Sequence, residues 1–126
     1  MTGWQKFFVF AALFNLSAGL PMIFAPELFY QLLLISEPIT VEAKLYMDLF
    51  AVLVLTFGWA YWTISRDPPA HRDLVLMGVI GKLLVVVVAW YHALAGTGPL
   101  NLALLILADL AFALVFLRYY LLSRAS

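Results

Sequence analysis

The sequence predicts an all-α membrane protein in which four helices cross the bilayer. Of its 126 residues, 66% are hydrophobic and 11% are charged, whereas a typical soluble domain has roughly 45–50% apolar and about 25% charged residues. Four apolar stretches are each close to the roughly 20 residues that a helix needs to span the hydrocarbon core. Because a lone strand cannot satisfy its backbone in lipid, and because the alternation of a β-barrel is absent, these stretches are expected to be helices.

The predicted architecture is a four-transmembrane-helix bundle that forms a single domain over residues 1–126. Short connections after the second and third spans predict that the last three helices are antiparallel neighbours. The expected spans cover about residues 7–24, 45–64, 74–94 and 100–117.

Prolines and small polar residues mark the ends of the expected helices. Pro21 and Pro26 are expected to close the first span, and Pro26 can open a short helix through Leu34. That helix is too short to cross the bilayer. It connects the first two spans and is expected to lie at the membrane–water interface. Thr40 is predicted to cap the second span, and Asp67 is predicted to cap the third, with two prolines in its first turn.

Basic residues predict the orientation in the membrane. Loops on the cytoplasmic side carry an excess of lysine and arginine. Five basic residues fall on one side of the predicted spans, whereas Lys44 alone falls on the other. Both termini are therefore expected to be cytoplasmic. The five residues on the predicted cytoplasmic side are Lys6, Arg66, Arg72, Arg118 and Arg124.

Composition and motifs exclude several classes of function. Seven basic and seven acidic residues cancel, so no global charge points to nucleic acid as a partner. The absence of cysteine excludes disulfides, thiolate metal sites and cysteine nucleophiles. There is no phosphate-binding glycine-rich loop and no HExxH motif, and the two histidines, His71 and His92, are expected on opposite sides. We therefore predict no catalytic residue, metal site or cofactor, and we lean against an enzyme.

Three polar residues are expected at one depth near the bilayer centre. Asn15, Lys82 and Asp109 each lie nine residues from a residue at the predicted cytoplasmic surface, which corresponds to a depth of about 13 Å. A charge at a helix centre costs roughly 2.5–3.5 kcal/mol on insertion scales. The opposite charges of Lys82 and Asp109 on adjacent antiparallel helices predict an ion pair. Asp48 and His92 are expected nearer the outer surface.

Each of these residues has a structural and a functional interpretation. The ion pair could fix the helix register, form a ligand or proton site, or contact another subunit. Asn15 could bond a neighbouring helix or a ligand. Asp48 could meet Lys44 one turn earlier or join His92, and His92 could belong to the aromatic belt at the interface.

Short motifs in the last three expected spans resemble a group of small bacterial four-helix membrane proteins. In size and topology this group is similar to the DoxX-like proteins. The resemblance implies a bacterial inner-membrane location and a four-helix bundle, and it implies no activity. The motifs are Gly58-Trp59-Ala60-Tyr61, Arg66-Asp67-Pro68, Gly78-Val79-Ile80-Gly81-Lys82 and Ala108-Asp109-Leu110.

Three hypotheses of function follow from the polar residues. The first is a binding or accessory subunit for a lipophilic small molecule or membrane partner, acting through the mid-membrane polar layer. The second is a proton-coupled or anion transporter or channel protomer, and the third is a membrane enzyme on a lipophilic substrate. Expected partners are membrane lipid and either further copies of the chain or a larger membrane complex. The candidate residues for ligand binding or proton relay are Asn15, Asp48, Lys82, His92 and Asp109.

Overall fold

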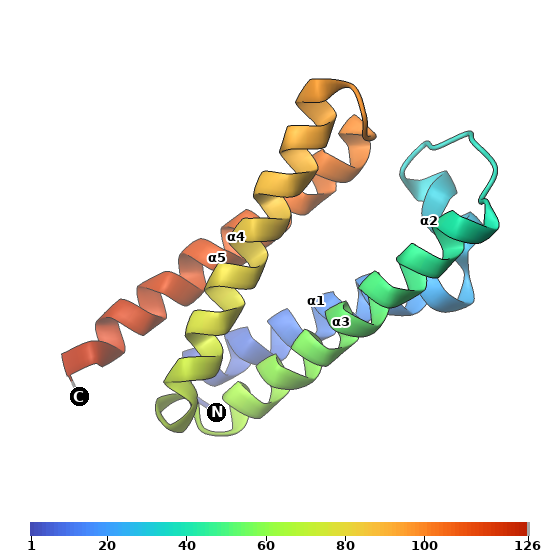
Figure 1. The fold of residues 1–126 in the computed structure, drawn as a ribbon. Helices are drawn as coiled ribbons and strands as arrows, with labels where there is room; N and C mark the ends of the chain where they lie inside the picture. Colours follow the sequence, from blue (N-terminus) through green and yellow to red (C-terminus); the bar gives the residue numbers. More distant parts are fainter. Residues whose placement is uncertain (126) are drawn as a thin grey trace. The chain divides into compact units, whose positions relative to one another are not determined.

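The computed structural model describes residues 1–125, and this part of the chain is helical with no strand (Figure 1). Contacts divide the chain into two compact units, Met1–Ser65 and a second unit that begins at Arg66. The elements are α1 (Gly3–Phe24), α2 (Pro26–Leu32), α3 (Val41–Arg66), the 3₁₀ helix η1 (Pro68–His71), α4 (Arg72–Ala95), α5 (Leu100–Leu122) and the 3₁₀ helix η2 (Ser123–Ala125).

Four of these helices, namely α1, α3, α4 together with η1, and α5, are long and apolar enough to cross a membrane. The predicted all-α fold with four spanning helices and a short helix between the first two is confirmed. Most of the helix ends lie outside the predicted spans, because polar flanking residues continue the helices past the apolar stretches. The grouping of all four helices into one domain stays a prediction.

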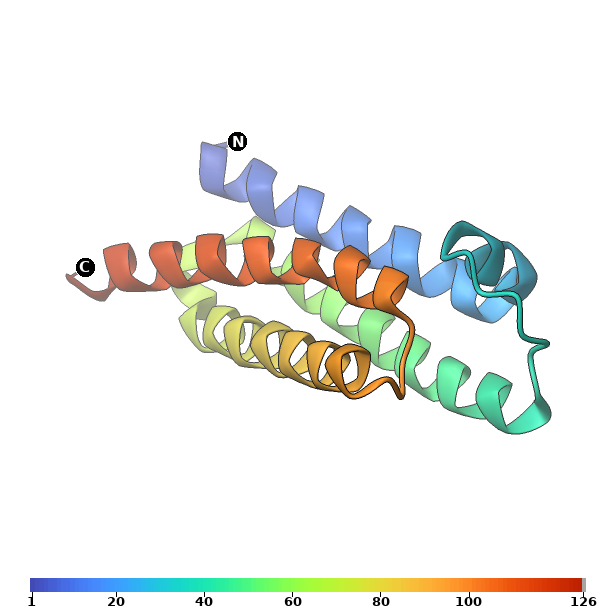
Figure 2. The ribbon, with the colours of Figure 1, turned by 90° about the horizontal axis from the view of Figure 1, so that it is seen from above.

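In the first unit, α1 and α3 run antiparallel, side by side (Figures 1 and 2). Glycines on both helices allow this approach. A Cβ atom added at Gly19 of α1 would lie 2.8 Å from Cδ2 of Leu55. One added at Gly58 of α3 would lie 3.2 Å from the Cβ atom of Asn15. Small residues at such positions are typical of helix contacts in membranes, where close backbone approach supplies the packing energy.

Pro21 does not end the first helix as predicted. It lies inside α1, which continues to Phe24. Proline removes one backbone donor, but its own carbonyl still accepts a hydrogen bond from the amide of Ala25 at 2.8 Å. Prolines are tolerated inside membrane helices because the lost hydrogen bond can be compensated locally. The break predicted for both prolines falls at Pro26 alone, which is the first residue of α2.

The short helix α2 ends two residues earlier than predicted. Leu34 has a φ of 57°, which lies in the left-handed region and cannot continue a right-handed helix. The adjacent Leu33 is buried. The predicted cap of the next helix is confirmed, since the Thr40 hydroxyl accepts a hydrogen bond from the Ala43 amide at 3.0 Å.

In the second unit, α4 and α5 form an antiparallel hairpin, with the two helices side by side in both views (Figures 1 and 2). Gly96 ends α4 with a φ of 76°, a conformation that glycine adopts without strain. The amides of Thr97 and Gly98 both donate to the carbonyl of His92, at 2.9 and 3.1 Å. These bonds satisfy a terminal carbonyl of α4 and set the geometry of the turn.

The start of the third span differs from the prediction. Asp67 makes no side-chain cap, and the residues from Pro68 to His71 form the separate 3₁₀ helix η1. The α-helix then begins at Arg72. The residue before a proline is disfavoured in the α conformation, and Asp67 accordingly has a φ of −159° and a ψ of 80°. The two consecutive prolines therefore lie in a separate 3₁₀ helix before α4, and not in the first turn of α4 as predicted.

Candidate binding site

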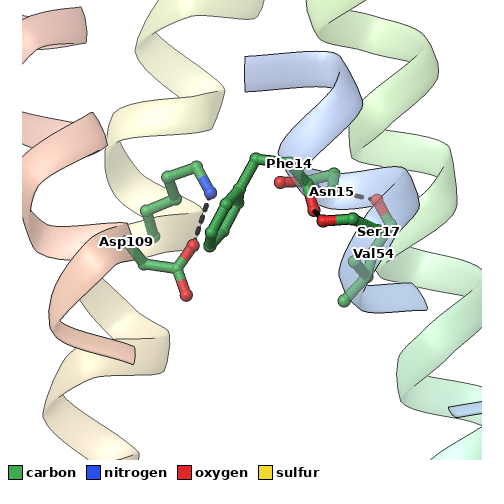
Figure 3. A network of polar contacts seen from close by, with 6 residues as sticks. Phe14, Asn15, Ser17, Val54 and Asp109 are labelled. Carbon is green, nitrogen blue, oxygen red and sulfur yellow. Dashed lines mark hydrogen bonds and ion pairs between the residues drawn. The ribbon is translucent and has the colours of Figure 1, made fainter. Parts of the chain in front are cut away.

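Lys82 and Asp109 form an ion pair between α4 and α5. The Lys82 ammonium donates to Oδ1 of Asp109 at 2.5 Å (Figure 3). Lys82 lies eleventh in the 24-residue α4, and Asp109 lies tenth in the 23-residue α5. Both side chains are therefore near the middle of their helices. The ion pair predicted from equal depth and opposite charge is confirmed.

The two partners of this pair are buried to different extents. The Lys82 side chain is 6% exposed and the Asp109 side chain is 19% exposed. The ammonium also lies 5.2 Å from the centre of the Phe112 ring, within the range of a cation–π interaction. Lys82 is thus largely buried, whereas part of the Asp109 carboxylate remains accessible.

A second polar cluster holds the other end of the same hairpin. Arg72, the first residue of α4, donates from Nε to the hydroxyl of Ser123 at 2.8 Å and from Nη2 to the carbonyl of Tyr120 at 3.0 Å. Its guanidinium also lies 4.2 Å from the centre of the Tyr120 ring. The last carbonyls of a helix lack partners within the helix, and an arginine is well suited to bond one of them. The sequence predicted Arg72 only as a basic flank of the span.

Replacing Arg72 with methionine is expected to lower the free energy of unfolding by about 1–2 kcal/mol, because two hydrogen bonds to a partly exposed guanidinium are lost. Unfolding in mixed micelles with increasing dodecyl sulfate would measure this change. Arg118→Met is the matched control, because Arg118 is exposed and no partner is recorded for it within residues 1–125. Equal effects of the two substitutions would show that Arg72 does not hold the hairpin.

Asn15 lies in the first unit, where it bonds the neighbouring helix. Its side-chain amide donates to the carbonyl of Val54 at 2.9 Å (Figure 3), and the residue is 5% exposed. This contact lies where Gly58 brings α3 close to α1. The Asn15 donor therefore links the two helices of its own unit.

Asp48 is paired with Lys44 in the first turns of α3. The Lys44 ammonium also donates to the carbonyl of Ile23 at 3.2 Å, in the last turn of α1. Of the two interpretations of Asp48, the structure supports the pairing with Lys44. The link to Ile23 was not predicted, because a backbone acceptor leaves no mark in the sequence.

His92 lies at the turn between α4 and α5. Its Nδ1 atom is 2.7 Å from the hydroxyl of Thr97, and its carbonyl accepts the two turn amides. The residue is ten positions from Lys82 along α4, which corresponds to about 15 Å. His92 is therefore part of the turn and does not join the mid-helix ion pair.

Among the predicted site residues, the structure brings together Lys82 and Asp109. Asn15 and Asp48 belong to the first unit, where Asn15 bonds the Val54 carbonyl and Asp48 pairs with Lys44. The layer predicted to combine Asn15 with the ion pair stays a prediction. Within residues 1–125, no group of three histidine, aspartate or glutamate side chains is arranged to hold a metal ion.

The fold and the ion pair define this chain as a multi-pass α-helical membrane protein with a charged pair between two adjacent spans. Comparisons with protein-family models, with curated proteins and with solved structures found no match. The resemblance of its short motifs to the DoxX-like proteins accordingly stays a prediction.

Proposed function

We propose that this protein binds a lipophilic ligand in the membrane through the Lys82–Asp109 pair. The observation that carries the proposal is an ion pair at the middle of two apolar helices whose carboxylate remains partly accessible. Ionisable residues inside membrane spans are costly and usually serve a function. Of the three hypotheses from the sequence, ligand binding is favoured by the accessible carboxylate.

The alternative interpretation is that the ion pair only fixes the register of α4 against α5. This register is already constrained at both ends of the hairpin. The short turn is held by the two amides bonded to His92, and the opposite end is held by Arg72 bonded to Tyr120 and Ser123. A buried ion pair also contributes little net stability compared with apolar residues of similar size. A purely structural role therefore leaves the cost of the two charges unexplained.

We also propose that both termini are cytoplasmic and that the protein resides in a bacterial inner membrane. The five-to-one distribution of basic residues supports this orientation. The absence of cysteine allows a direct test with single-cysteine variants. Ser36→Cys is expected to react with a membrane-impermeant maleimide in intact cells, whereas Ala70→Cys is expected to react only after the cells are opened. The reverse pattern would show the opposite orientation.

The binding proposal is tested by native mass spectrometry of protein extracted gently from the membrane. The wild-type chain is expected to retain a lipophilic molecule, and Lys82→Met/Asp109→Leu is expected to lose it. The matched control is Lys44→Met/Asp48→Leu, which removes the partly exposed ion pair of the first unit and is expected to retain the molecule.

Two results would contradict the proposal. One is a wild-type protein with no bound molecule, and the other is equal retention by the two double variants. The same spectra report oligomeric state. We propose that further copies of the chain or a larger membrane complex act as partners, because four short helices give one chain little room for an alternating-access mechanism.

A further inference from the structure

We infer that the ligand is an uncharged lipophile with a hydroxyl group, and that this hydroxyl donates a hydrogen bond to Oδ2 of Asp109. The inference rests on the proposed binding function and specifies the chemistry of the ligand. It begins from the two oxygens of the Asp109 carboxylate, which have different surroundings.

Oδ1 of Asp109 accepts the hydrogen bond from Lys82. Figure 3 shows the second oxygen directed away from this bond, and within residues 1–125 the structure records no donor at Oδ2. An ionised carboxylate can accept several hydrogen bonds. An acceptor without a donor is costly in hydrocarbon, where water does not replace the missing partner. The accessible part of Asp109 therefore favours a ligand that brings a donor.

The charges of the pair favour a neutral ligand. The Lys82 ammonium is enclosed, bonded to Oδ1 and close to the Phe112 ring, so an anion would approach the carboxylate before it reached the positive charge. A cation at Oδ2 would compete with Lys82 and would add a net charge to the middle of the membrane. A hydroxyl supplies one donor and no charge.

The position of Asp109 along α5 excludes ordinary phospholipids as the source of the donor. Asp109 is nine residues before Arg118, which corresponds to about 13 Å along the helix. The donors of phospholipids lie in the polar headgroup region, outside the hydrocarbon core. The ligand must therefore carry its hydroxyl into the membrane interior, on a molecule that is otherwise apolar.

The side chain one turn from Asp109 favours a small molecule over the helix of a second protein. Leu105 lies four residues before Asp109, on the same face of α5, and is 43% exposed. Closely packed helix interfaces in membranes use small residues at the contact, and the small residue one turn in the other direction, Ala113, is already buried. A bulky exposed leucine beside the carboxylate suits a flexible hydrocarbon chain.

The test compares two probes on the full-length chain in phosphatidylcholine nanodiscs. One probe is a radiolabelled long-chain secondary alcohol with its hydroxyl at mid-chain, and the other is the methyl ether of the same alcohol. The ether keeps the shape and hydrophobicity of the alcohol but has no donor. Retention by empty nanodiscs is subtracted for each probe. The ether is then expected to bind at least about tenfold more weakly than the alcohol, since a hydrogen bond to a charged group is lost.

Variants distinguish recognition of the hydroxyl by the Asp109 carboxylate from general hydrophobic binding of the probe. Lys82→Met/Asp109→Leu is expected to bind alcohol and ether equally weakly, because no acceptor remains. Lys82→Met/Asp109→Asn keeps a neutral carbonyl acceptor and is expected to retain a smaller preference for the alcohol. The comparison of the two probes on the wild-type chain needs no variant, so it does not depend on whether the variants fold.

Three outcomes would overturn the inference. If the wild-type chain binds alcohol and ether equally, the donor is not recognised, although a retained ligand in native mass spectra would leave the binding function in place. If the preference for the alcohol persists in the variant without an acceptor, another group recognises it. If Lys82→Met/Asp109→Leu converts an oligomer to a monomer and the alcohol does not bind, the occupant is the helix of a second copy.

Discussion

Replacing Asp109 with leucine is expected to lower the free energy of unfolding of this protein by about 3–5 kcal/mol, because removing one partner of a buried ion pair leaves the other charge uncompensated. The Lys82 side chain is 6% exposed, so water cannot readily compensate the charge of its ammonium. Unfolding in mixed micelles with increasing dodecyl sulfate would measure the loss.

The double variant Lys82→Met/Asp109→Leu is the control for this prediction. Replacing both members of a buried ion pair with apolar residues of similar volume is often neutral or stabilising. Most of the stability lost in the single variant is therefore expected to return. If the double variant is as unstable as Asp109→Leu, the hairpin needs the ion pair for its fold, and the contacts at its two ends do not fix the register.

The ion pair could be predicted from the sequence because its two partners are side chains with opposite charges at one depth. Counting nine residues inward from Asp73 and from Arg118 was sufficient. The links at the helix ends could not be predicted in this way. Arg72 and Lys44 bond the carbonyls of Tyr120 and Ile23, and every residue has a carbonyl, so the choice of acceptor depends on how the helices pack.

The errors in helix boundaries have a related cause. Pro21 and Pro68 are both strong local signals, but their effects differ. Inside α1 the loss of one donor is tolerated because the flanking turns continue to bond, as the Ala25 amide does with the Pro21 carbonyl. Before α4 a second proline follows directly, and the chain forms η1 instead. A single residue type therefore does not decide whether a helix ends.

Within residues 1–125, each unit has a polar contact between the middles of its helices and a cation bonded to a terminal carbonyl. In the first unit these are Asn15 with Val54 and Lys44 with Ile23. In the second unit Arg72 bonds a terminal carbonyl, that of Tyr120, but the contact between the middles of the helices is the ion pair of Lys82 with Asp109. An amide bonded to a backbone carbonyl would link two helices at lower cost. The use of two charges in the second unit is what favours a functional role there.

Replacing Gly19 with valine is expected to destabilise the first unit by about 3 kcal/mol, because overpacking a closely packed contact forces side chains and backbone to shift. A Cβ atom at this position would lie 2.8 and 2.9 Å from Cδ2 and Cγ of Leu55 and 3.3 Å from the carbonyl oxygen of Ala51. Cδ2 is the mobile end of a side chain, but the carbonyl belongs to the backbone of α3. Unfolding in mixed micelles measures the change.

Gly3→Val is the matched control for this substitution, because a Cβ atom at Gly3 of the same helix would meet no atom within 4 Å. It is expected to change stability by less than about 0.5 kcal/mol, as is usual for surface substitutions. Adding Leu55→Ala to Gly19→Val makes room for the new side chain, so the double variant is expected to be more stable than additivity of the two single substitutions allows. Strict additivity, or equal losses at Gly19 and Gly3, would mean that α1 and α3 are not held by this close approach. The Asn15 bond to Val54 would then carry a larger share of their contact.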